Sequence, residues 1–213
     1  MKTAGIVLCG GRSSRMGAPK ASLPFGPERM LQRVVRLLSG VVDRIVVVAA
    51  PGQSIPALPA EVTFAHDRRE GQGPLEGLAA GLTALGDDVD AVYATSCDVP
   101  LLVPAFVQRM FDLLEDHAIA VPRDGEYHHP LAAVYRPTVR PQVEQLIAAG
   151  RMRPVFLFER VRTRQVRPDE WIDVDPGSCT LSNLNRPEDY LAALAAAGYE
   201  APPDVMEHLR GSK

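Results

Sequence analysis

Apolar runs of strand length alternate along the chain with longer segments in which apolar residues recur every three or four positions. The runs of strand length lie at residues 5–8, 45–49, 62–65, 91–95 and 118–121. The segments with helical periodicity lie at residues 30–38, 74–85 and 103–114. The run 45–49 has no polar residue, which is typical of a strand that a parallel sheet buries on both faces. The alternation predicts an α/β fold with a doubly wound, mostly parallel sheet and helices on both faces.

The regular alternation of strand and helix patterns ends after residue 122. Asp124-Gly125-Glu126 predicts a hairpin turn, residues 131–135 a strand, and residues 139–149 a helix, with a shorter helix after Pro154. We find no internal repeat and no low-complexity linker.

The last predicted helix begins at Pro187, because proline suits a first helical turn. Asn185 is its predicted N-cap, and the acidic residues 188–189 suit its positive end. We predict a single domain over residues 1–200 and a C-terminal tail over residues 201–213, in which we expect partial disorder.

Composition and charge narrow the class of protein. Apolar residues make up 46% of the 213 residues and charged residues 23%, which are ordinary globular values. The net charge of −3 argues against nonspecific binding to nucleic acid, since there is no basic surplus to displace counterions. The basic residues instead gather locally, which suits an anionic small molecule; they are Arg12, Arg15, Lys20, Arg151 and Arg153.

The cysteines indicate a reducing compartment. Cys9, Cys97 and Cys179 lie far apart and form no Cys-x-x-Cys pair, so we interpret them as small buried residues. The sequence shows no signal-peptide pattern and no apolar run of membrane-spanning length. We therefore expect a cytoplasmic protein without a membrane partner.

The most informative motif is the glycine-rich loop that follows the first strand. Gly10, Gly11 and Gly17 leave backbone N–H groups accessible to a phosphate chain, and Arg15 and Lys20 add positive charge. The spacing fits neither a Walker loop nor a dinucleotide fingerprint. An ordinary tight turn is the alternative, but the added Arg and Lys favour a triphosphate site.

Asp98 is the main candidate metal ligand. It ends the strand 91–95 within Cys97-Asp98-Val99-Pro100, and Mg²⁺ commonly takes one or two carboxylates together with phosphate oxygens. The alternative is an N-cap for the next helix, although Val103 lies too far along the chain for simple capping.

A second glycine segment, Gly73–Gly77, opens the helix 74–85. Gly77 and Gly81 lie on one helical face, where they could hold a base against the backbone or serve close packing. Asp67, at the end of the preceding strand, could contact a base edge or a ribose. Alternatively, it could be a polar residue that only terminates the strand. Asn183 and Asn185 alternate toward one side of an extended stretch, where they could orient phosphates, complete a metal shell or form a capping turn.

Taken together, LCGGRSSRMGAPK, DRREGQGPLEG, CDVP and NLNRPED resemble the molybdenum cofactor guanylyltransferase family. The motifs occur in the family's order over residues 4–192. The first and third belong to a wider group of nucleotidyltransferases, whereas GPLxG and the paired asparagines narrow the choice. The resemblance implies a Rossmann-like fold of the nucleotide-diphospho-sugar transferase type.

The resemblance also implies the reaction. It is a Mg²⁺-dependent transfer of GMP from GTP to the phosphate of molybdenum-molybdopterin, with release of pyrophosphate. GTP and molybdenum-molybdopterin are then the partners, and molybdoenzymes or their chaperones are candidate protein partners. The alternatives are a CTP-dependent molybdenum cofactor cytidylyltransferase and another nucleotidyltransferase that acts on a small phosphate. By resemblance, the pair Gly10-Gly11 favours a guanine nucleotide.

Residue roles follow from the same resemblance. The residues expected to contact the nucleotide are Leu8, Cys9, Gly10, Gly11, Lys20, Asp67, Gly73, Leu75, Gly77 and Asp98. Lys20, Arg15, Asp98 and Asn185 would carry catalysis, with Asp98 as the Mg²⁺ ligand. Three departures from the family pattern are Cys9 in place of alanine, Pro19 in place of aspartate, and Val48 or Ala49 in the region of a nucleotide-contacting asparagine.

The pterin phosphate is expected to approach from a different set of side chains. These are Asn183, Asn185, His129, Arg151 and Arg153. His128 and His129 could instead be ordinary surface residues, and they lack the spacing of a zinc site. The whole hypothesis requires the ammonium of Lys20 and the carboxyl group of Asp98 to lie at one edge of the sheet.

Overall fold

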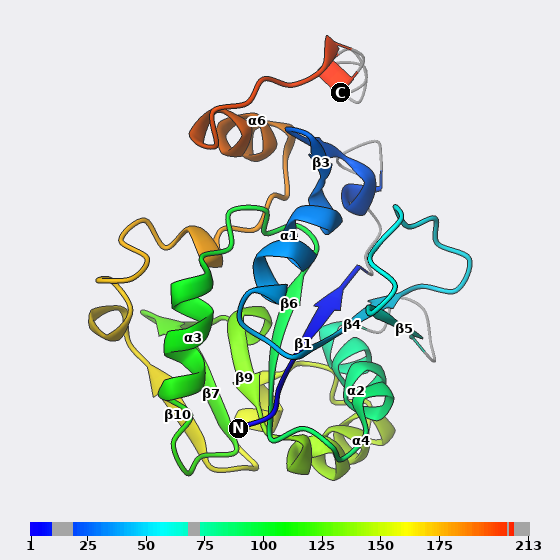
Figure 1. Ribbon diagram of the computed structural model, residues 1–213. Coiled ribbons are helices and arrows are strands. Elements are labelled where there is room, and N and C mark those ends of the chain that lie inside the picture. Colours follow the sequence, from blue (N-terminus) through cyan, green and yellow to red (C-terminus); the bar gives the residue numbers. More distant parts are fainter. Residues whose placement is uncertain (10–18, 68–72, 204, 207–213) are drawn as a thin grey trace.

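A computed structural model describes residues 1–9, 19–67, 73–203 and 205–206. Within these ranges an eight-stranded sheet forms the centre of the molecule, with helices on both of its faces (Figure 1). Its strands are β1 (Thr3–Leu8), β4 (Arg44–Ala49), β5 (Thr63–His66), β6 (Ala91–Ser96), β7 (Ile119–Asp124), β8 (Tyr127–His128), β9 (Ala133–Tyr135) and β10 (Thr163–Val166). The order across the sheet is β10-β7-β9-β6-β1-β4-β5, and β8 pairs with β7.

The strand directions confirm a mostly parallel sheet. β1 runs parallel to both β4 and β6, so that Leu8 lies opposite Val48 on one side and Ser96 on the other. β9 is reversed and pairs antiparallel with β6 and β7. The last residues of β1, β4 and β6 therefore share one edge, the carboxyl edge, where ligands of open α/β sheets bind.

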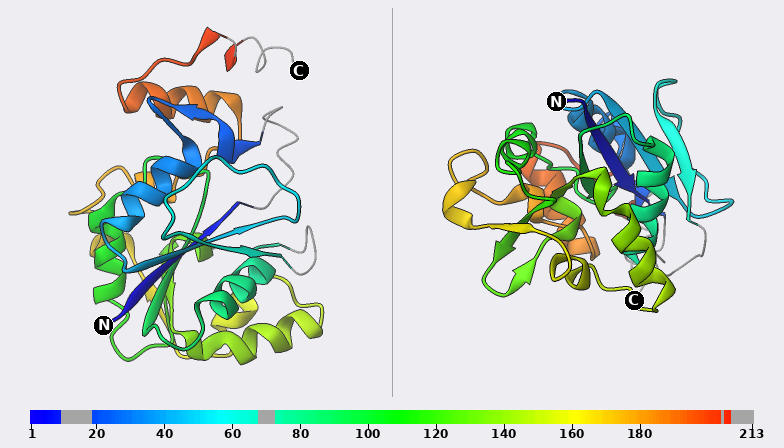
Figure 2. Two further views of the ribbon diagram at one scale, coloured as in Figure 1. Left: turned by 45° about the vertical axis from the view of Figure 1, so that its right-hand side comes forward. Right: turned by 90° about the horizontal axis from the view of Figure 1, so that it is seen from below.

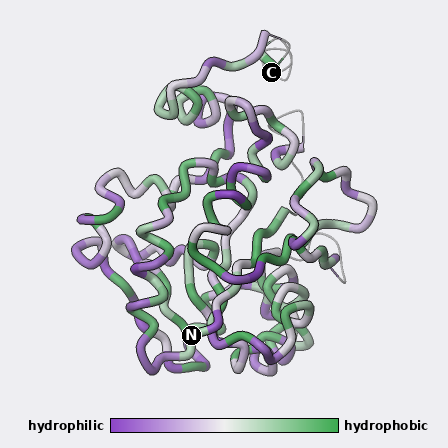
Figure 3. Tube along the Cα trace, in the orientation of Figure 1, coloured by the Kyte–Doolittle hydropathy of each residue, from purple (hydrophilic) through white to green (hydrophobic). Residues whose placement is uncertain are grey.

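Helices cover the two faces of the sheet (Figure 2). They are α1 (Met30–Ser39), α2 (Pro74–Leu85), α3 (Pro104–Asp112), α4 (Arg140–Ala148), α5 (Val155–Phe158) and α6 (Pro187–Ala196). Along the end of β1 and into Cys9 directly after it, alternate residues belong to different cores. Val7 and Cys9 pack in the core that contains residues of α1 and α3, whereas Ile6 and Leu8 pack in the core that contains residues of α2 and α4. Figure 3 shows the hydrophobic residues along the central strands and mixed polarity along the helices.

The glycines of α2 explain how closely this helix lies on β1. A Cβ on Gly81 would come within 2.6 Å of Ile6, and one on Gly77 within 2.9 Å of Leu8. Both distances are shorter than ordinary carbon contacts, so a larger residue would push the helix away from the strand. Of the two interpretations of Gly77 and Gly81, the structure supports close packing.

A third apolar cluster joins the C-terminal helix to the chain that follows Lys20. α6 packs against β2 (Pro24–Phe25), whose antiparallel partner is β3 (Glu28–Arg29), above the carboxyl edge in Figure 1. The hydroxyl of Tyr190 donates to the carbonyl of Pro24 at 2.5 Å. Gly26 has φ +64° and lies directly under the Tyr199 ring. α6 therefore fixes the segment 183–186 relative to Lys20.

Several sequence predictions need correction. The N-cap of α6 is Arg186, not Asn185; the carboxylate of Asp189 accepts hydrogen bonds from the N–H groups of both residues, at 2.9 and 3.1 Å. The strand predicted at 131–135 is shorter, because a 3-10 turn occupies Pro130–Ala132.

Four short strands were not predicted, and two residues of the C-terminal tail are packed. Ala201 and Val205, in the tail predicted to be partly disordered, pack against the third cluster. β2, β3, β8 and β10 were not predicted, because two-residue strands have no readable period and β10 is a largely polar edge strand. Among the described residues, no helix is long and apolar enough to span a bilayer.

Candidate active site

Lys20, Asp98 and Asn185 meet at the carboxyl edge of the sheet although they are far apart in the sequence. The ammonium of Lys20 donates to Oδ2 of Asp98 at 2.7 Å and to Oδ1 of Asn185 at 3.0 Å. The side chains of Lys20 and Asp98 are 17% and 12% exposed, so the ion pair is only partly shielded from solvent. The requirement that these two charges share one edge is met.

The second carboxylate oxygen of Asp98 is also held. Ser96 Oγ donates to Oδ1 of Asp98, and Asn183 Nδ2 donates to the same atom at 3.2 Å. The backbone N–H of Leu184 donates to the carbonyl of Asp98 at 2.9 Å. The segment 183–185 thus lies along the end of β6 and is tied to it by both backbone and side chains.

Alternation along this segment follows the prediction from the sequence. Asn183 and Asn185 both turn toward the Asp98–Lys20 pair, whereas Leu184 between them is 4% exposed and packs in the third cluster. Because Asn185 does not cap α6, its side-chain oxygen is available to Lys20. The capping alternative for the paired asparagines is wrong.

The oxygen atoms around the Lys20 ammonium are of the kind that bind a hard cation. Oδ2 of Asp98 and Oδ1 of Asn185 converge on one positive group, the Lys20 ammonium. Carboxylate and amide oxygens are ligands that Mg²⁺ accepts, and among the described residues the hydrogen-bond partners of this ammonium are such oxygens. The residues present therefore fit the Mg²⁺ that the sequence predicted at Asp98.

The end of β1 is more constrained than the sequence indicated. The N–H of Cys9 donates to the carbonyl of Val48 at 2.8 Å, and its carbonyl accepts from Nε2 of Gln53 at 3.0 Å. The carbonyl of Leu8 accepts from the N–H of Cys97 at 3.0 Å. A nucleotide contact through the Cys9 backbone would have to use the remaining lone pair of its carbonyl.

Gln53 is a residue of this edge that sequence reasoning missed. Its Oε1 accepts from the N–H of Ala50 at 3.2 Å while its Nε2 holds the Cys9 carbonyl. The side chain therefore links the end of β1 to the loop after β4. A polar residue in a turn directly after a buried strand at the carboxyl edge is the signal that could have pointed to it.

The Cys9 thiol is not a nucleophile in this arrangement. Contact with the Cys97 thiol, followed by burial, raises the pKa of Cys9 far above its usual range. Both cysteines are 5% exposed. This supports the interpretation of Cys9 and Cys97 as buried packing residues.

The start of α2 combines an unusual backbone with a buried core residue. Gly73 has φ +89° and ψ −179°, a conformation that is essentially restricted to glycine. Leu75 is 0% exposed, so any nucleotide contact at this residue must be made by its backbone. Asp67, at the end of β5, has a buried Oδ1 without a hydrogen-bond partner, and burial, followed by the charge of Glu76, raises its pKa.

The residues predicted for the pterin-phosphate side do not all meet at the Lys20–Asp98 pair. Asn183 and Asn185 do. Among the described residues, no hydrogen bond or ion pair links His129, Arg151 or Arg153 to that pair; Arg151 instead lies 3.8 Å from Glu159 and 3.9 Å from the Phe156 ring centroid.

Burial disfavours the charged form of the two histidines near that side. Burial lowers the pKa of both His128 and His129 below the usual value of 6.5. A neutral imidazole attracts a phosphate only weakly. This weakens the predicted role of His129, which is half-buried rather than a free surface residue.

Three of the predicted site residues lie outside the described part of the chain. They are Gly10, Gly11 and Arg15. The phosphate-binding role of the glycine-rich loop therefore stays a prediction.

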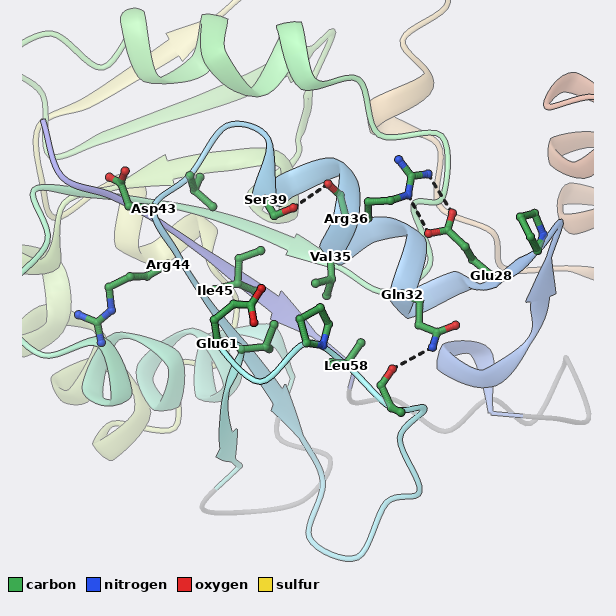
Figure 4. A pocket seen from close by; sticks show the side chains of 15 residues that line it. Glu28, Gln32, Val35, Arg36, Ser39, Asp43, Arg44, Ile45, Leu58 and Glu61 are labelled. Carbon is green, nitrogen blue, oxygen red and sulfur yellow. Dashed lines mark hydrogen bonds and ion pairs between the residues drawn. The ribbon is translucent and has the colours of Figure 1, made fainter.

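A pocket of about 660 Å³ lies elsewhere, between α1 and the loop that precedes β5 (Figure 4). Val35, Ile45 and Leu58 contribute apolar walls, and Glu28 and Arg36 form an ion pair at one end. None of the predicted site residues lines it. The pocket is therefore separate from the Lys20–Asp98 pair.

Comparison with known families decides the class of the protein. Residues 5–165 match the model of the MobA-like NTP transferase domain. The chain belongs to this family. It is accordingly a nucleotidyltransferase, as the sequence motifs predicted.

Relatives of similar length carry related names. The chain is 38% identical over 203 residues to a probable molybdenum cofactor guanylyltransferase of Mycobacterium avium, covering 92% of this chain and 97% of the relative. It is 29% identical over 197 residues to a protein of the same name from Pelotomaculum thermopropionicum, covering 92% and 94%.

Solved structures share the fold. Molybdopterin-guanine dinucleotide biosynthesis protein A from Archaeoglobus fulgidus has a TM-score of 0.76 at 20% identity, covering 93% of this chain and 99% of that one. A 2-C-methyl-D-erythritol 4-phosphate cytidylyltransferase from Thermus thermophilus has a TM-score of 0.66 at 16% identity, covering 91% and 98%. The Rossmann-like fold of the nucleotide-diphospho-sugar transferase type is thus confirmed.

Proposed function

We propose that this nucleotidyltransferase transfers GMP from GTP to the phosphate of molybdenum-molybdopterin and releases pyrophosphate. Its family and the names of its full-length relatives support this choice. The observation that carries it is the cluster of Lys20, Asp98 and Asn185, which gathers a cation and hard oxygen ligands at the carboxyl edge of the sheet.

Asp98 would hold Mg²⁺, with the side-chain oxygen of Asn185 as a second candidate ligand. When bound, the ion supplies positive charge to phosphate oxygens. Asn183 and Ser96 fix the orientation of the Asp98 carboxylate through its other oxygen. Asn183 and Ser96 would position the carboxylate, because both donate to Oδ1 of Asp98, whereas Lys20 donates to Oδ2.

The residues of the chain need to supply little acid–base chemistry. The attacking group is a phosphate that is already anionic at neutral pH, so the reaction requires no strong general base. The main obstacle is repulsion between two anionic reactants, and the ammonium of Lys20 would neutralise part of the charge of the triphosphate. Contact with Cys97, followed by burial, raises the pKa of the Cys9 thiol, which argues against a covalent cysteine intermediate at this position.

The test is an assay of pyrophosphate release with molybdopterin and each of GTP, CTP and ATP, with and without Mg²⁺. We expect release with GTP that depends on both molybdopterin and Mg²⁺. Release with CTP alone would replace the guanylyl assignment by a cytidylyl one. No release with any nucleotide would contradict the proposed function.

A further inference from the structure

Arg33 is a partly buried cation on α1 that binds the loop directly after Asp98. Its Nε donates to the carbonyl of Pro100 at 2.8 Å, and its side chain is 17% exposed. A hydrogen bond from a charged donor is about twice as strong as a neutral one. The contact therefore ties α1 to the chain two residues beyond the candidate metal ligand.

The same guanidinium lies over two aromatic rings of the third cluster. Its central carbon is 5.0 Å from the centroid of the Phe25 ring and 5.8 Å from that of Tyr199, and the two rings meet edge to face. Phe25 is 0% exposed. The planar guanidinium is suited to such contacts, because it can stack on a ring and donate in its own plane at the same time. A further contact, with Glu28, is longer at 3.8 Å.

Arg33 thus joins the two segments that carry the opposite charges of the site. The chain from Lys20 leads through a short 3-10 turn into β2, where Phe25 lies, and the chain from Asp98 leads to Pro100. The 2.7 Å contact between the Lys20 ammonium and the Asp98 carboxylate depends on how these segments pack. Residues 96 and 183 hold the carboxylate of Asp98 itself. Arg33 instead holds the backbone beyond it.

We infer that Arg33 is a positioning residue. Through the Pro100 carbonyl and the Phe25 ring it sets the placement of Asp98 relative to Lys20, and with it the affinity of the site for a divalent ion. The inference rests on the proposed function, because it takes Asp98 to be the Mg²⁺ ligand. It assigns a role to a residue that lies in none of the sequence motifs. Arg33 acts through other residues and touches no reacting group.

The first experiment measures nucleotide binding without an acceptor, so that no transfer can occur. GTP alone and GTP with Mn²⁺ as a probe for Mg²⁺ are titrated by calorimetry into the wild type and Arg33→Met. The factor by which Mn²⁺ strengthens binding should fall by about tenfold, the effect of losing one hydrogen bond from a charged group. Binding of metal-free GTP should change by less than about twofold on the same scale. An unchanged metal factor, or an equal loss for both titrations, overturns the inference.

Two further variants separate positioning from general stabilisation. Arg33→Lys keeps a charged donor for Pro100 but loses the planar group over Phe25, so it should lose only part of the metal factor, about threefold. Arg36→Met is the matched control. Arg36 lies on the same helix and pairs with Glu28, and the described contacts of its side chain include neither Pro100 nor Phe25. It should keep the wild-type metal factor. Circular dichroism checks that each variant is folded; if Arg33→Met is not, Arg33→Lys carries the test.

The second experiment is steady-state release of pyrophosphate as a function of Mg²⁺ concentration. Arg33→Met should raise the apparent KM for Mg²⁺ by about tenfold, whereas kcat at saturating Mg²⁺ should stay within about threefold of the wild type, because the Asp98 carboxylate is retained. A lower kcat that added Mg²⁺ does not restore, with an unchanged KM for Mg²⁺, would show that Arg33 only stabilises the fold. That result overturns the inference.

These outcomes distinguish the inference from the proposed function. If Arg33→Met loses the metal factor in calorimetry but the wild type releases no pyrophosphate with molybdopterin, the proposed reaction is wrong and the role of Arg33 stands. If the wild type carries out Mg²⁺-dependent transfer and Arg33→Met keeps both the metal factor and the KM for Mg²⁺, the role of Arg33 is wrong and the proposed function stands.

Discussion

Two groups of carboxylates at the carboxyl edge of the sheet differ in how their charge is balanced. Asp98 has Lys20 on one oxygen and the donors of Ser96 and Asn183 on the other. Asp67 and Glu76 each keep a buried oxygen without a partner among the described residues.

The difference separates two ways of building a site. The Asp98 cluster is assembled and electrically balanced before any ligand binds, so it is suited to holding charge in a fixed geometry. The Asp67–Glu76 pair leaves buried carboxylate oxygens without a described donor, which lowers the free energy of unfolding. We therefore expect changes at Asp98 to affect turnover most and changes at the pair to affect stability.

The largest effect is expected for Asp98→Asn. Loss of the carboxylate charge removes the predicted Mg²⁺ ligand, and the transfer rate at saturating Mg²⁺ should fall by about 100-fold or more. Circular dichroism should show a native fold, because an amide can still accept from Ser96 and Asn183. Asp88→Asn, an exposed loop residue, serves as control. Near-normal turnover would remove Asp98 from the metal role.

Lys20→Met should weaken both nucleotide binding and turnover. We expect KM for GTP to rise and kcat to fall by roughly tenfold each, since a charge-assisted contact to phosphate is lost. Steady-state kinetics of pyrophosphate release measures both constants, with Lys2→Met, an exposed terminal residue, as control. Unchanged kinetics would show that the Lys20 ammonium only balances Asp98.

Gly81→Ala tests whether close packing places the helix that carries Glu76. The added Cβ would lie 2.6 Å from Ile6, so the free energy of unfolding should fall by about 1–3 kcal/mol. Chemical denaturation measures it. Gly40→Ala is the control, because the nearest atom to its added Cβ is 3.6 Å away. Equal losses in the two variants would argue against tight packing of α2 on β1.

Gln53→Ala is expected to have a smaller effect on binding. Removal of its hydrogen bonds to Cys9 and Ala50 frees the end of β1, which should raise KM for GTP by about threefold to tenfold. Because Gln53 contacts backbone and not Asp98, kcat should stay close to the wild-type value. Gln108→Ala, an exposed residue on α3, provides the comparison. A selective loss of kcat would instead place Gln53 near the reacting groups.

The smallest effect concerns pH and Asp67. Its pKa in the folded protein lies above the ordinary value of 3.8, so the folded state holds the proton more tightly than the unfolded state. Its contribution to the free energy of unfolding is therefore largest at low pH and declines as the pH rises from 3.8 through the folded pKa. Asp67→Asn should remove this decline and raise the melting temperature at neutral pH. A steeper decline in the variant would contradict the assignment.

Much of the site could be predicted because strand ends of a parallel sheet share one edge. Lys20, Asp98 and the paired asparagines follow from motifs whose positions in the fold are determined by β1, β6 and the start of α6. Gln53 and Glu76 could not be found this way. Gln53 belongs to no motif, and Glu76 lies inside DRREGQGPLEG without a role assigned to it; what distinguishes each is a contact, or its absence, between distant segments.

The sequence by itself determined the α/β alternation, the glycine-rich loop after the first strand and the polar residues at the strand ends, because hydrophobic period and residue chemistry are local properties. Only the tertiary structure decided that Gly77 and Gly81 serve packing, that Asn185 binds Lys20 instead of capping α6, and that Glu76 is buried without a partner. Each of these depends on which atoms of another element occupy the neighbouring space, and that is settled when the helices pack on the sheet.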